Sequence, residues 1–284
     1  MKINSALKST ADLLHVHSDS PELDAQVLLA HILDKPRPWL IAHPETPLTA
    51  LEADSLQVAL AQLTDGTPLP YILGHWEFFA RDFILTPDVL IPRPETELLV
   101  ERSLTWMKES PDRRLAADVG TGSGCIAVCL AASLTDLQVL ATDISPAALA
   151  VAKRNALHHH VTDRINFLEC DLLPPSSTFD FRPSTFNLIC ANLPYIPTET
   201  MLSLPIYGRE PTLALDGGHD GLVLIRRLLT LAPTWLAPQA LILLETESSL
   251  GQETVALARE FFPNEKIILH KDLAGHERLV EIQT

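Results

Sequence analysis

From residue 112 onward, short apolar segments alternate with helix-like segments, and this alternation constrains the fold more than any other feature of the sequence. Strands are expected at 115–119, 139–142, 165–169, 186–191 and 241–245, with helices beginning at Cys125, at Pro146 and near Leu222. Such an order predicts an α/β domain whose mostly parallel sheet is covered by helices on both faces. Two later strands, 266–270 and 278–282, flank a turn and predict an antiparallel C-terminal hairpin.

The first 75 residues have a different pattern. Apolar residues such as Leu28, Leu29 and Ile32 recur at helical intervals between proline-containing turns, which predicts a small helical bundle. The aromatic and β-branched run 71–79, followed by 81–85, predicts a short hairpin. We therefore expect a helical domain at 1–75, a hairpin linker at 76–92 and the α/β domain at 93–284. A helix should begin near Glu95, because prolines hold 91–94 extended.

Composition excludes several classes of protein. With 46% hydrophobic and 20% charged residues, the chain is neither disordered nor of membrane type. The formal net charge of -15 argues against binding to nucleic acid, which requires a Lys/Arg surface. The N-terminus has no long apolar run, so we expect a cytoplasmic protein without a membrane anchor. The four cysteines form no CxxC pair, and no metal site is expected.

The loop between the first strand and the helix after it, 118–124, reads Asp-Val-Gly-Thr-Gly-Ser-Gly. Glycines at 120, 122 and 124 would let a nucleoside-type ligand approach the backbone. Compared with the dinucleotide fingerprint, the third glycine is one residue early, and the Asp118 carboxylate suits a ligand with an amino group better than one with phosphates. Asp143 ends the second strand, where a carboxylate can accept hydrogen bonds from ribose hydroxyls. Asp171 and Leu172 follow the third strand and are expected at the adenine end.

The tetrapeptide Asn192-Leu193-Pro194-Tyr195 follows the fourth strand. It resembles the (N/D)PPY signature of methyltransferases that act on planar amide or exocyclic amino nitrogens. The lone pair of an amide nitrogen is delocalised, so the enzyme must position that nitrogen and stabilise the charge that develops on it. The Asn192 side-chain oxygen and the Leu193 carbonyl could accept its two N–H groups. Pro194 keeps Leu193 extended, and the Tyr195 ring can pack against the planar target.

The whole chain resembles the release-factor glutamine methyltransferase family. Besides the two loops above, the segments that carry this resemblance are 24–31, 71–74, 90–97, 210–211, 214–215, 217–222 and 272–275. The resemblance implies a class I S-adenosylmethionine-dependent methyltransferase with a Rossmann-like fold, preceded by an N-terminal helical domain that docks the substrate. The implied substrate is the glutamine of the GGQ motif in class I peptide chain release factors, with S-adenosylhomocysteine as the second product. A monomer is expected.

The resemblance also implies residue roles. The cofactor would contact Asp118, Gly120, Thr121, Gly122, Ser123, Gly124, Asp143, Asp171, Leu172 and Asn192, and the catalytic motif would be Asn192, Leu193, Pro194 and Tyr195. The sequence departs from the family at position 193, where leucine replaces the first proline of the motif. The substrate-binding carbonyl is retained there, but the shape of the pocket is expected to differ. A second departure is 237–240, Ala-Pro-Gln-Ala, where a glycine turn would be expected before the fifth strand.

Two other functions fit the same motifs. An N6-adenine-type nucleic-acid methyltransferase could hold its exocyclic amine with the same asparagine, although it would need a basic channel and base extrusion. A catalytically impaired protein that binds S-adenosylmethionine would follow if Leu193 had disabled the chemistry. Methyl incorporation into nucleic acid would identify the first, and cofactor binding without turnover would identify the second.

Overall fold

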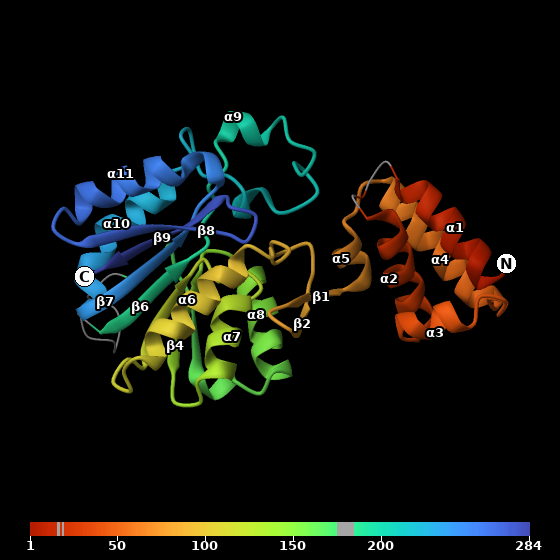
Figure 1. The fold of residues 1–284 in the computed structure, drawn as a ribbon, viewed down its shortest axis with the longest axis horizontal. Coiled ribbons are helices and arrows are strands. Elements are labelled where there is room, and N and C mark those ends of the chain that lie inside the picture. Colours follow the sequence, from red (N-terminus) through yellow and green to blue (C-terminus); the bar gives the residue numbers. More distant parts are fainter. Residues whose placement is uncertain (16–17, 19, 175–184) are drawn as a thin grey trace. The chain divides into compact units, whose positions relative to one another are not determined.

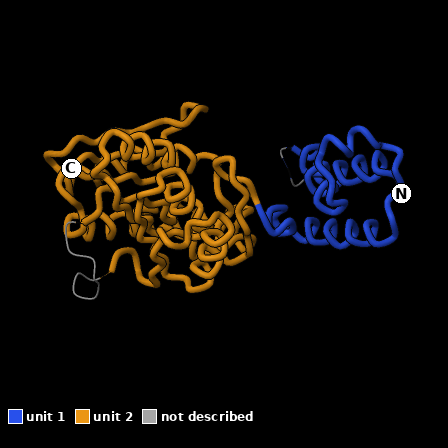
Figure 2. The backbone as a smooth tube through the Cα atoms, turned by 90° about the horizontal axis from the view of Figure 1, so that it is seen from below, with its two compact units in different colours: residues 1–75 blue, residues 76–284 orange. Residues whose placement is uncertain are grey.

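The computed structural model describes residues 1–15, 18, 20–174 and 185–284. Its contacts divide the chain into two compact units, Met1–His75 and Trp76–Thr284, which Figure 2 shows in separate colours. Each unit has its own core and is described by itself. In the described part of the chain, no helix is both long and apolar enough to cross a bilayer.

The N-terminal unit is a helical bundle, as predicted. Its helices are α1 (Ile3–Leu14), α2 (Pro21–Leu33), α3 (Arg37–Ala42), α4 (Ala50–Thr64) and α5 (Leu69–Leu73). The core is formed by leucines such as Leu28, Leu40 and Leu56, which are fully buried. A capping box begins α4, in which the Thr49 and Glu52 side chains each accept the other's backbone N–H.

The prediction of a strand from residue 71 was wrong. Residues 69–73 form the short helix α5, which has Pro70 in its first turn and ends at Gly74 in the left-handed conformation, φ 75°. The Gly74 N–H donates to the Pro70 carbonyl at 3.0 Å. Proline at the start and glycine at the end favour a helical turn over a strand, whatever the residues between them. The predicted hairpin itself is present, as β1 (His75–Phe78) and β2 (Arg81–Ile84).

The larger unit contains a seven-stranded sheet in the order β5-β4-β3-β6-β7-β9-β8 (Figure 1). Its strands are β3 (Leu115–Val119), β4 (Gln138–Asp143), β5 (Ile165–Glu169), β6 (Phe186–Ala191), β7 (Leu236–Glu245), β8 (Lys266–Lys271) and β9 (Glu277–Gln283). Neighbouring strands from β5 to β7 are parallel, whereas β9 is antiparallel to both β7 and β8. The prediction of a mostly parallel sheet with an antiparallel C-terminal strand is confirmed.

Helices cover both faces of this sheet (Figure 1). They are α6 (Thr96–Lys108), α7 (Cys125–Ser133) and α8 (Pro146–His158) on one face, and α10 (Val223–Trp235) and α11 (Gly251–Phe261) on the other. Short turns of helix lie at α9 (Thr198–Met201), η1 (Thr162–Arg164), η2 (Thr212–Ala214) and η3 (Ser248–Leu250). Successive strand residues belong to opposite cores, Ala116 to the first and Ala117 to the second. Strands buried on both faces explain the continuous apolar runs in the sequence.

Strand β7 begins without the glycine turn expected at 237–240. It starts at Leu236, directly after α10, and the pairing register with β6 shifts between Leu236 and Leu241. Gln239 lies within this irregular stretch and has φ 57°, a left-handed conformation that usually favours glycine. A bulge at Gln239 therefore makes the bend for which a glycine was expected.

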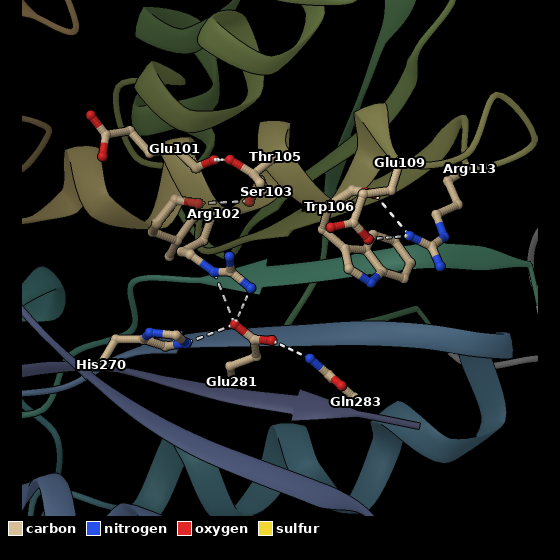
Figure 3. A network of polar contacts seen from close by, with 11 residues as sticks. Glu101, Arg102, Ser103, Thr105, Trp106, Glu109, Arg113, His270, Glu281 and Gln283 are labelled. Carbon is tan, nitrogen blue, oxygen red and sulfur yellow. Dashed lines mark hydrogen bonds and ion pairs between the residues drawn. The ribbon is translucent and has the colours of Figure 1, made fainter.

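A buried carboxylate joins α6 to the C-terminal hairpin (Figure 3). Glu281 on β9 is fully buried, and its Oε2 accepts hydrogen bonds from Arg102 Nε (3.0 Å) and Nη2 (2.7 Å). The ring nitrogen Nε2 of His270, on β8, lies 2.7 Å from the same oxygen. Gln283 Nε2 donates to Oε1 at 2.6 Å, so both oxygens of Glu281 have partners.

The strand order reverses between β3 and β6, which are neighbours at the centre of the sheet. In open α/β sheets, ligands bind beyond the carboxyl ends of the strands at such a reversal. Residues 120–124 follow β3, and residues 192–195 follow β6. The topology thus brings the two predicted motifs, some 70 residues apart in the sequence, to one crevice.

Candidate active site

A cavity of about 330 Å³ lies at the carboxyl ends of the central strands. Most of the predicted cofactor residues line it, namely Gly120, Thr121, Gly122, Ser123, Asp143, Asp171, Leu172 and Asn192. Apolar residues from elsewhere complete the walls, among them Val89, Leu90, Pro92, Ile144, Leu213 and Leu224. An apolar cavity with a few convergent polar groups is typical of a small-molecule site.

The three glycines of the loop have different functions. Gly120 and Gly122 have φ of 75° and 54°, in the left-handed region. A Cβ on Gly122 would meet nothing within 4 Å, so this residue faces open space in the cavity. Gly124 does not line the cavity. A Cβ there would lie 3.0 Å from the Cβ of Ala152, so Gly124 permits the close packing of α7 on α8.

Asp143 fixes the loop from the neighbouring strand. Its Oδ2 accepts the Gly122 N–H at 2.9 Å, and its Oδ1 accepts the Ser145 N–H at 2.9 Å. Burial raises the pKa of Asp143, and these backbone hydrogen bonds oppose the rise. Each carboxylate oxygen keeps a further lone pair, and the side chain lines the cavity. Asp143 can therefore accept hydroxyl groups of a ligand while it holds the loop.

Asp118 is buried behind the loop and is not among the residues that line the cavity. Its Oδ2 accepts the Thr121 hydroxyl (2.6 Å) and the Ala127 N–H (3.1 Å), whereas Oδ1 has no partner in the described part of the chain. Burial raises its pKa to about 6. These contacts show Asp118 bracing the loop and the first turn of α7.

Asp171 and Leu172, which follow β5, also line the cavity. Asp171 Oδ2 accepts a hydrogen bond from Arg227 Nη2 at 2.6 Å, and both side chains are about half exposed. Leu172 has φ 64°, and its carbonyl accepts the Thr142 hydroxyl at 2.7 Å. The ion pair and the hydrogen bond fix the corner after β5 to α10 and β4.

Asn192 points into the cavity with its side chain oriented by a neighbour. The Nδ2 atom donates to the hydroxyl oxygen of Thr96 at 3.0 Å, and Thr96 is 1% exposed. Because the nitrogen end has a partner, the Oδ1 end of the carboxamide is available as an acceptor. Thr96 begins α6, and it too lines the cavity.

Leu193 is 4% exposed and packs against the glycine loop. A Cβ on Gly120 would lie only 3.0 Å from Leu193 Cδ2, so position 120 cannot take a larger residue without displacing Leu193. The leucine that replaces the proline of the motif therefore fills the space between the two loops. Leu193 also lines the cavity, as does Pro194.

A second cavity of about 230 Å³ shares Leu90, Ala214 and residues 192–194 with the first. Tyr195, Arg93 and Ile206 line it, but they do not line the larger cavity. Burial raises the pKa of Tyr195, so its phenol stays neutral. Asn192 thus stands between two adjoining spaces, one beside the glycine loop and one beside Tyr195.

Glu210 anchors the segment that forms a wall of both cavities. It is 7% exposed, and its carboxylate accepts the Ile91 N–H at 3.0 Å and Arg93 Nη2 at 2.6 Å. Sequence reasoning did not assign a function to Glu210, nor to Thr96 or Glu245, a buried carboxylate at the end of β7. The signal for Glu245 was present, because a single carboxylate ends the apolar run 241–244 and buried charges are rare.

Two family models match the chain. Residues 5–74 match the PrmC N-terminal domain, and residues 116–204 match a methyltransferase domain. Among curated relatives, the release factor glutamine methyltransferase of Moorella thermoacetica is 42% identical over 263 residues, which cover 92% of this chain and 90% of that protein. The protein of the same name from Bordetella pertussis is 40% identical over 264 residues, covering 91% of this chain and 93% of its own length.

Among solved structures, the N-terminal domain of human METTL16 in complex with SAH aligns with a TM-score of 0.51. The alignment covers 90% of this chain and 93% of that one at 17% sequence identity. At this identity the likeness concerns the fold, which is that of a methyltransferase domain.

Proposed function

The chain belongs to the release factor glutamine methyltransferase family, and from this premise we propose that it transfers a methyl group from S-adenosylmethionine to the side-chain amide nitrogen of the GGQ glutamine in class I peptide chain release factors. The observation that carries the proposal is Asn192, whose carboxamide is oriented by Thr96 at the junction of two cavities. We also propose that the enzyme is a monomer in the cytoplasm. Its formal net charge of -15 favours a protein substrate over a nucleic acid, whose phosphates would need basic residues to bind them.

The residues of the larger cavity fit the cofactor. Gly122 leaves open space beside the loop, and Asp143 offers free lone pairs for ribose hydroxyls. The apolar walls formed by Ile144, Leu172 and Leu224 suit an adenine ring. Among the described residues, Asp118 Oδ1 is a buried acceptor without a hydrogen-bond partner, and the charge of this carboxylate behind the loop favours a ligand with an amino group.

We assign the acceptor to the second cavity. Asn192 Oδ1 and the Leu193 carbonyl would each accept one N–H of the glutamine carboxamide, which fixes the plane and position of the nitrogen. The Tyr195 ring would pack against the face of that amide. When bound, S-adenosylmethionine supplies an electrophilic methyl group, whose C–S bond breaks as the C–N bond forms, leaving S-adenosylhomocysteine. Asn192 Oδ1 stabilises the positive charge that develops on the nitrogen, and the displaced proton passes to water.

A labelling experiment tests the proposed function. With methyl-labelled S-adenosylmethionine, the purified protein should label a class I release factor and should not label its Gln→Ala variant at the GGQ glutamine. DNA and RNA incubated in parallel should stay unlabelled, because the protein has no surplus of basic residues to neutralise phosphates. Equal labelling of the two release factors would contradict the assignment, and label in nucleic acid would favour an adenine acceptor.

A further inference from the structure

Glu245 is a buried titratable group that the mechanism above does not use. It is 3% exposed at the carboxyl end of β7, and its Oε2 has no hydrogen-bond partner in the described part of the chain. Strand β7 pairs in parallel with β6, where Ala191 is opposite Leu244. Glu245 therefore lies beside Asn192, one residue further along each strand.

Thr96 connects the two side chains. Its hydroxyl oxygen accepts the Asn192 Nδ2–H at 3.0 Å, and the same side chain lies near enough to Glu245 for hydrogen bonding from Thr96 to lower the pKa of that carboxyl. A hydroxyl has one proton to donate and lone pairs to accept with. While Glu245 is ionised it can only accept, so the Thr96 proton points to Glu245 and a Thr96 lone pair faces Asn192. With the Thr96 hydroxyl in this orientation, Asn192 Nδ2 donates to Thr96, and Asn192 Oδ1 is directed at the cavity as an acceptor.

We propose that Glu245 is a positioning residue for methyl transfer: through Thr96, its carboxylate sets the orientation of the Asn192 carboxamide and keeps Oδ1 directed at the acceptor nitrogen. The proposal rests on the proposed function for the role of Asn192 and adds Glu245 and Thr96 to it. Neither residue needs to touch the substrate. A protonated Glu245 would donate to Thr96, and the Thr96 hydroxyl could then donate to Asn192 Oδ1 and occupy the acceptor.

The surroundings of Glu245 place its titration near neutrality. Burial raises the pKa of Glu245 to about 7, the hydrogen bond from Thr96 opposes the rise, and the charge of Glu95 adds to it. Arg278 and Arg93 also act on it and lower its pKa. Glu245 also acts on Tyr195 and Cys125, whose pKa values are both raised by burial, that of Cys125 to about 12. Neither of these two titrates between pH 6 and 8 under these conditions.

The test is a pH profile of kcat at saturating substrates from about pH 5.5 to about pH 8.5. The wild type should lose activity on the acid side with a midpoint near 7, where Glu245 takes up a proton. Glu245→Gln should be roughly tenfold slower at the alkaline end, where one charge-assisted hydrogen bond is lost, and should lose the acid limb centred near pH 7, leaving only a fall near pH 6 from protonation of Asp118. Thr96→Ser keeps the hydroxyl and should keep the limb, whereas Thr96→Val should abolish it. Glu253→Gln, an exposed change on α11, is the matched control.

A second readout does not depend on the acceptor. In ¹⁵N-labelled protein, the Asn192 side-chain NH₂ signals, identified by their absence in Asn192→Ala, should shift with pH around the same midpoint. They should not titrate in Glu245→Gln. An acid limb or a titration that persists unchanged in Glu245→Gln overturns the proposal. If the wild type labels no release factor while the NMR titration of Asn192 depends on Glu245, the connection from Glu245 to Asn192 is supported and the proposed function is contradicted.

Discussion

Replacement of Asn192 by alanine should lower kcat for methyl transfer by about 10³-fold, in the range seen when one preorganised polar contact to a transition state is removed. The amide nitrogen needs an acceptor for its N–H that becomes stronger as positive charge develops, and Asn192 Oδ1 is oriented for this by Thr96. Without it the nitrogen loses both its position and part of its charge stabilisation. Steady-state kinetics with a purified release factor measure the effect.

The loss should fall on the chemical step and not on the fold. Asn192 contributes one side chain to a cavity whose loop is held mainly by Asp143 and Thr142. Binding of S-adenosylhomocysteine, measured by calorimetry, should therefore weaken less than about tenfold, the equivalent of one hydrogen bond. Asn166→Ala, at an exposed position on β5, is the control and should be unaffected. A variant at position 192 with more than about a tenth of wild-type kcat would exclude this role.

The largest effect on stability is expected at Glu281. Its carboxylate is fully buried and accepts hydrogen bonds from Arg102, His270 and Gln283. Glu281→Ala leaves the Arg102 guanidinium, 29% exposed, without its buried partner. Breaking such a pair from one side should lower the free energy of unfolding by about 3 kcal/mol. Urea unfolding near neutral pH measures this loss.

The effect of Glu281→Ala should depend on pH in a defined direction. Burial alone would raise the pKa of Glu281, but hydrogen bonds from Gln283, Arg102 and His270 outweigh burial and lower it below the ordinary 4.5. A carboxylate with a lowered folded-state pKa stabilises the protein above its unfolded-state value, and this contribution disappears as the pH falls through the folded-state value. The difference in stability between wild type and Glu281→Ala should thus be full at neutral pH and shrink below pH 4.5.

Glu260→Ala provides the control for this prediction, because Glu260 is exposed on α11. It should change the free energy of unfolding by less than about 0.5 kcal/mol. A double-mutant cycle with Arg102→Ala should give a coupling energy well above that of a surface pair. Additive effects of Glu281→Ala and Arg102→Ala would show that the network in Figure 3 does not act as a unit.

Much of the fold could be predicted because the sheet is buried on both faces. Such strands are continuous apolar runs, and their parallel order follows from the helices between them. Once β3 and β6 are neighbours, the meeting of Gly120 and Leu193 follows, since both come after the carboxyl ends of their strands. The motif positions in the sequence were enough to predict which loops line the cavity.

The local backbone conformation was harder to predict where two sequence patterns conflict. The side chains of Tyr71 and Ile72 favour strands, but Pro70 and Gly74 make this segment a helical turn. At Gln239, a non-glycine residue adopts a left-handed conformation within a bulge. The pairing of β6 and β7 around Gln239 holds this conformation, and no residue type in the segment predicts a left-handed residue there.

The partners within the site could not be predicted from spacing. Thr96, Asn192 and Glu245 come from three separate segments, and their hydrogen bonds depend on how α6 packs against β6 and β7. Asp118 illustrates the same limit, because its hydrogen bonds to Thr121 and Ala127 could not be read from its position before the loop. Position along a strand indicates which edge a side chain reaches, whereas its partner depends on tertiary packing.

The central claim, that the methyl acceptor is one glutamine amide, is tested most directly by locating the methyl group. A class I release factor is treated with the enzyme and S-adenosylmethionine, digested and sequenced by mass spectrometry. The account predicts one added methyl on the GGQ glutamine, which acid hydrolysis releases as methylamine, leaving glutamate. A methyl group on any other residue of the release factor, or one that hydrolysis does not release as methylamine, would contradict it.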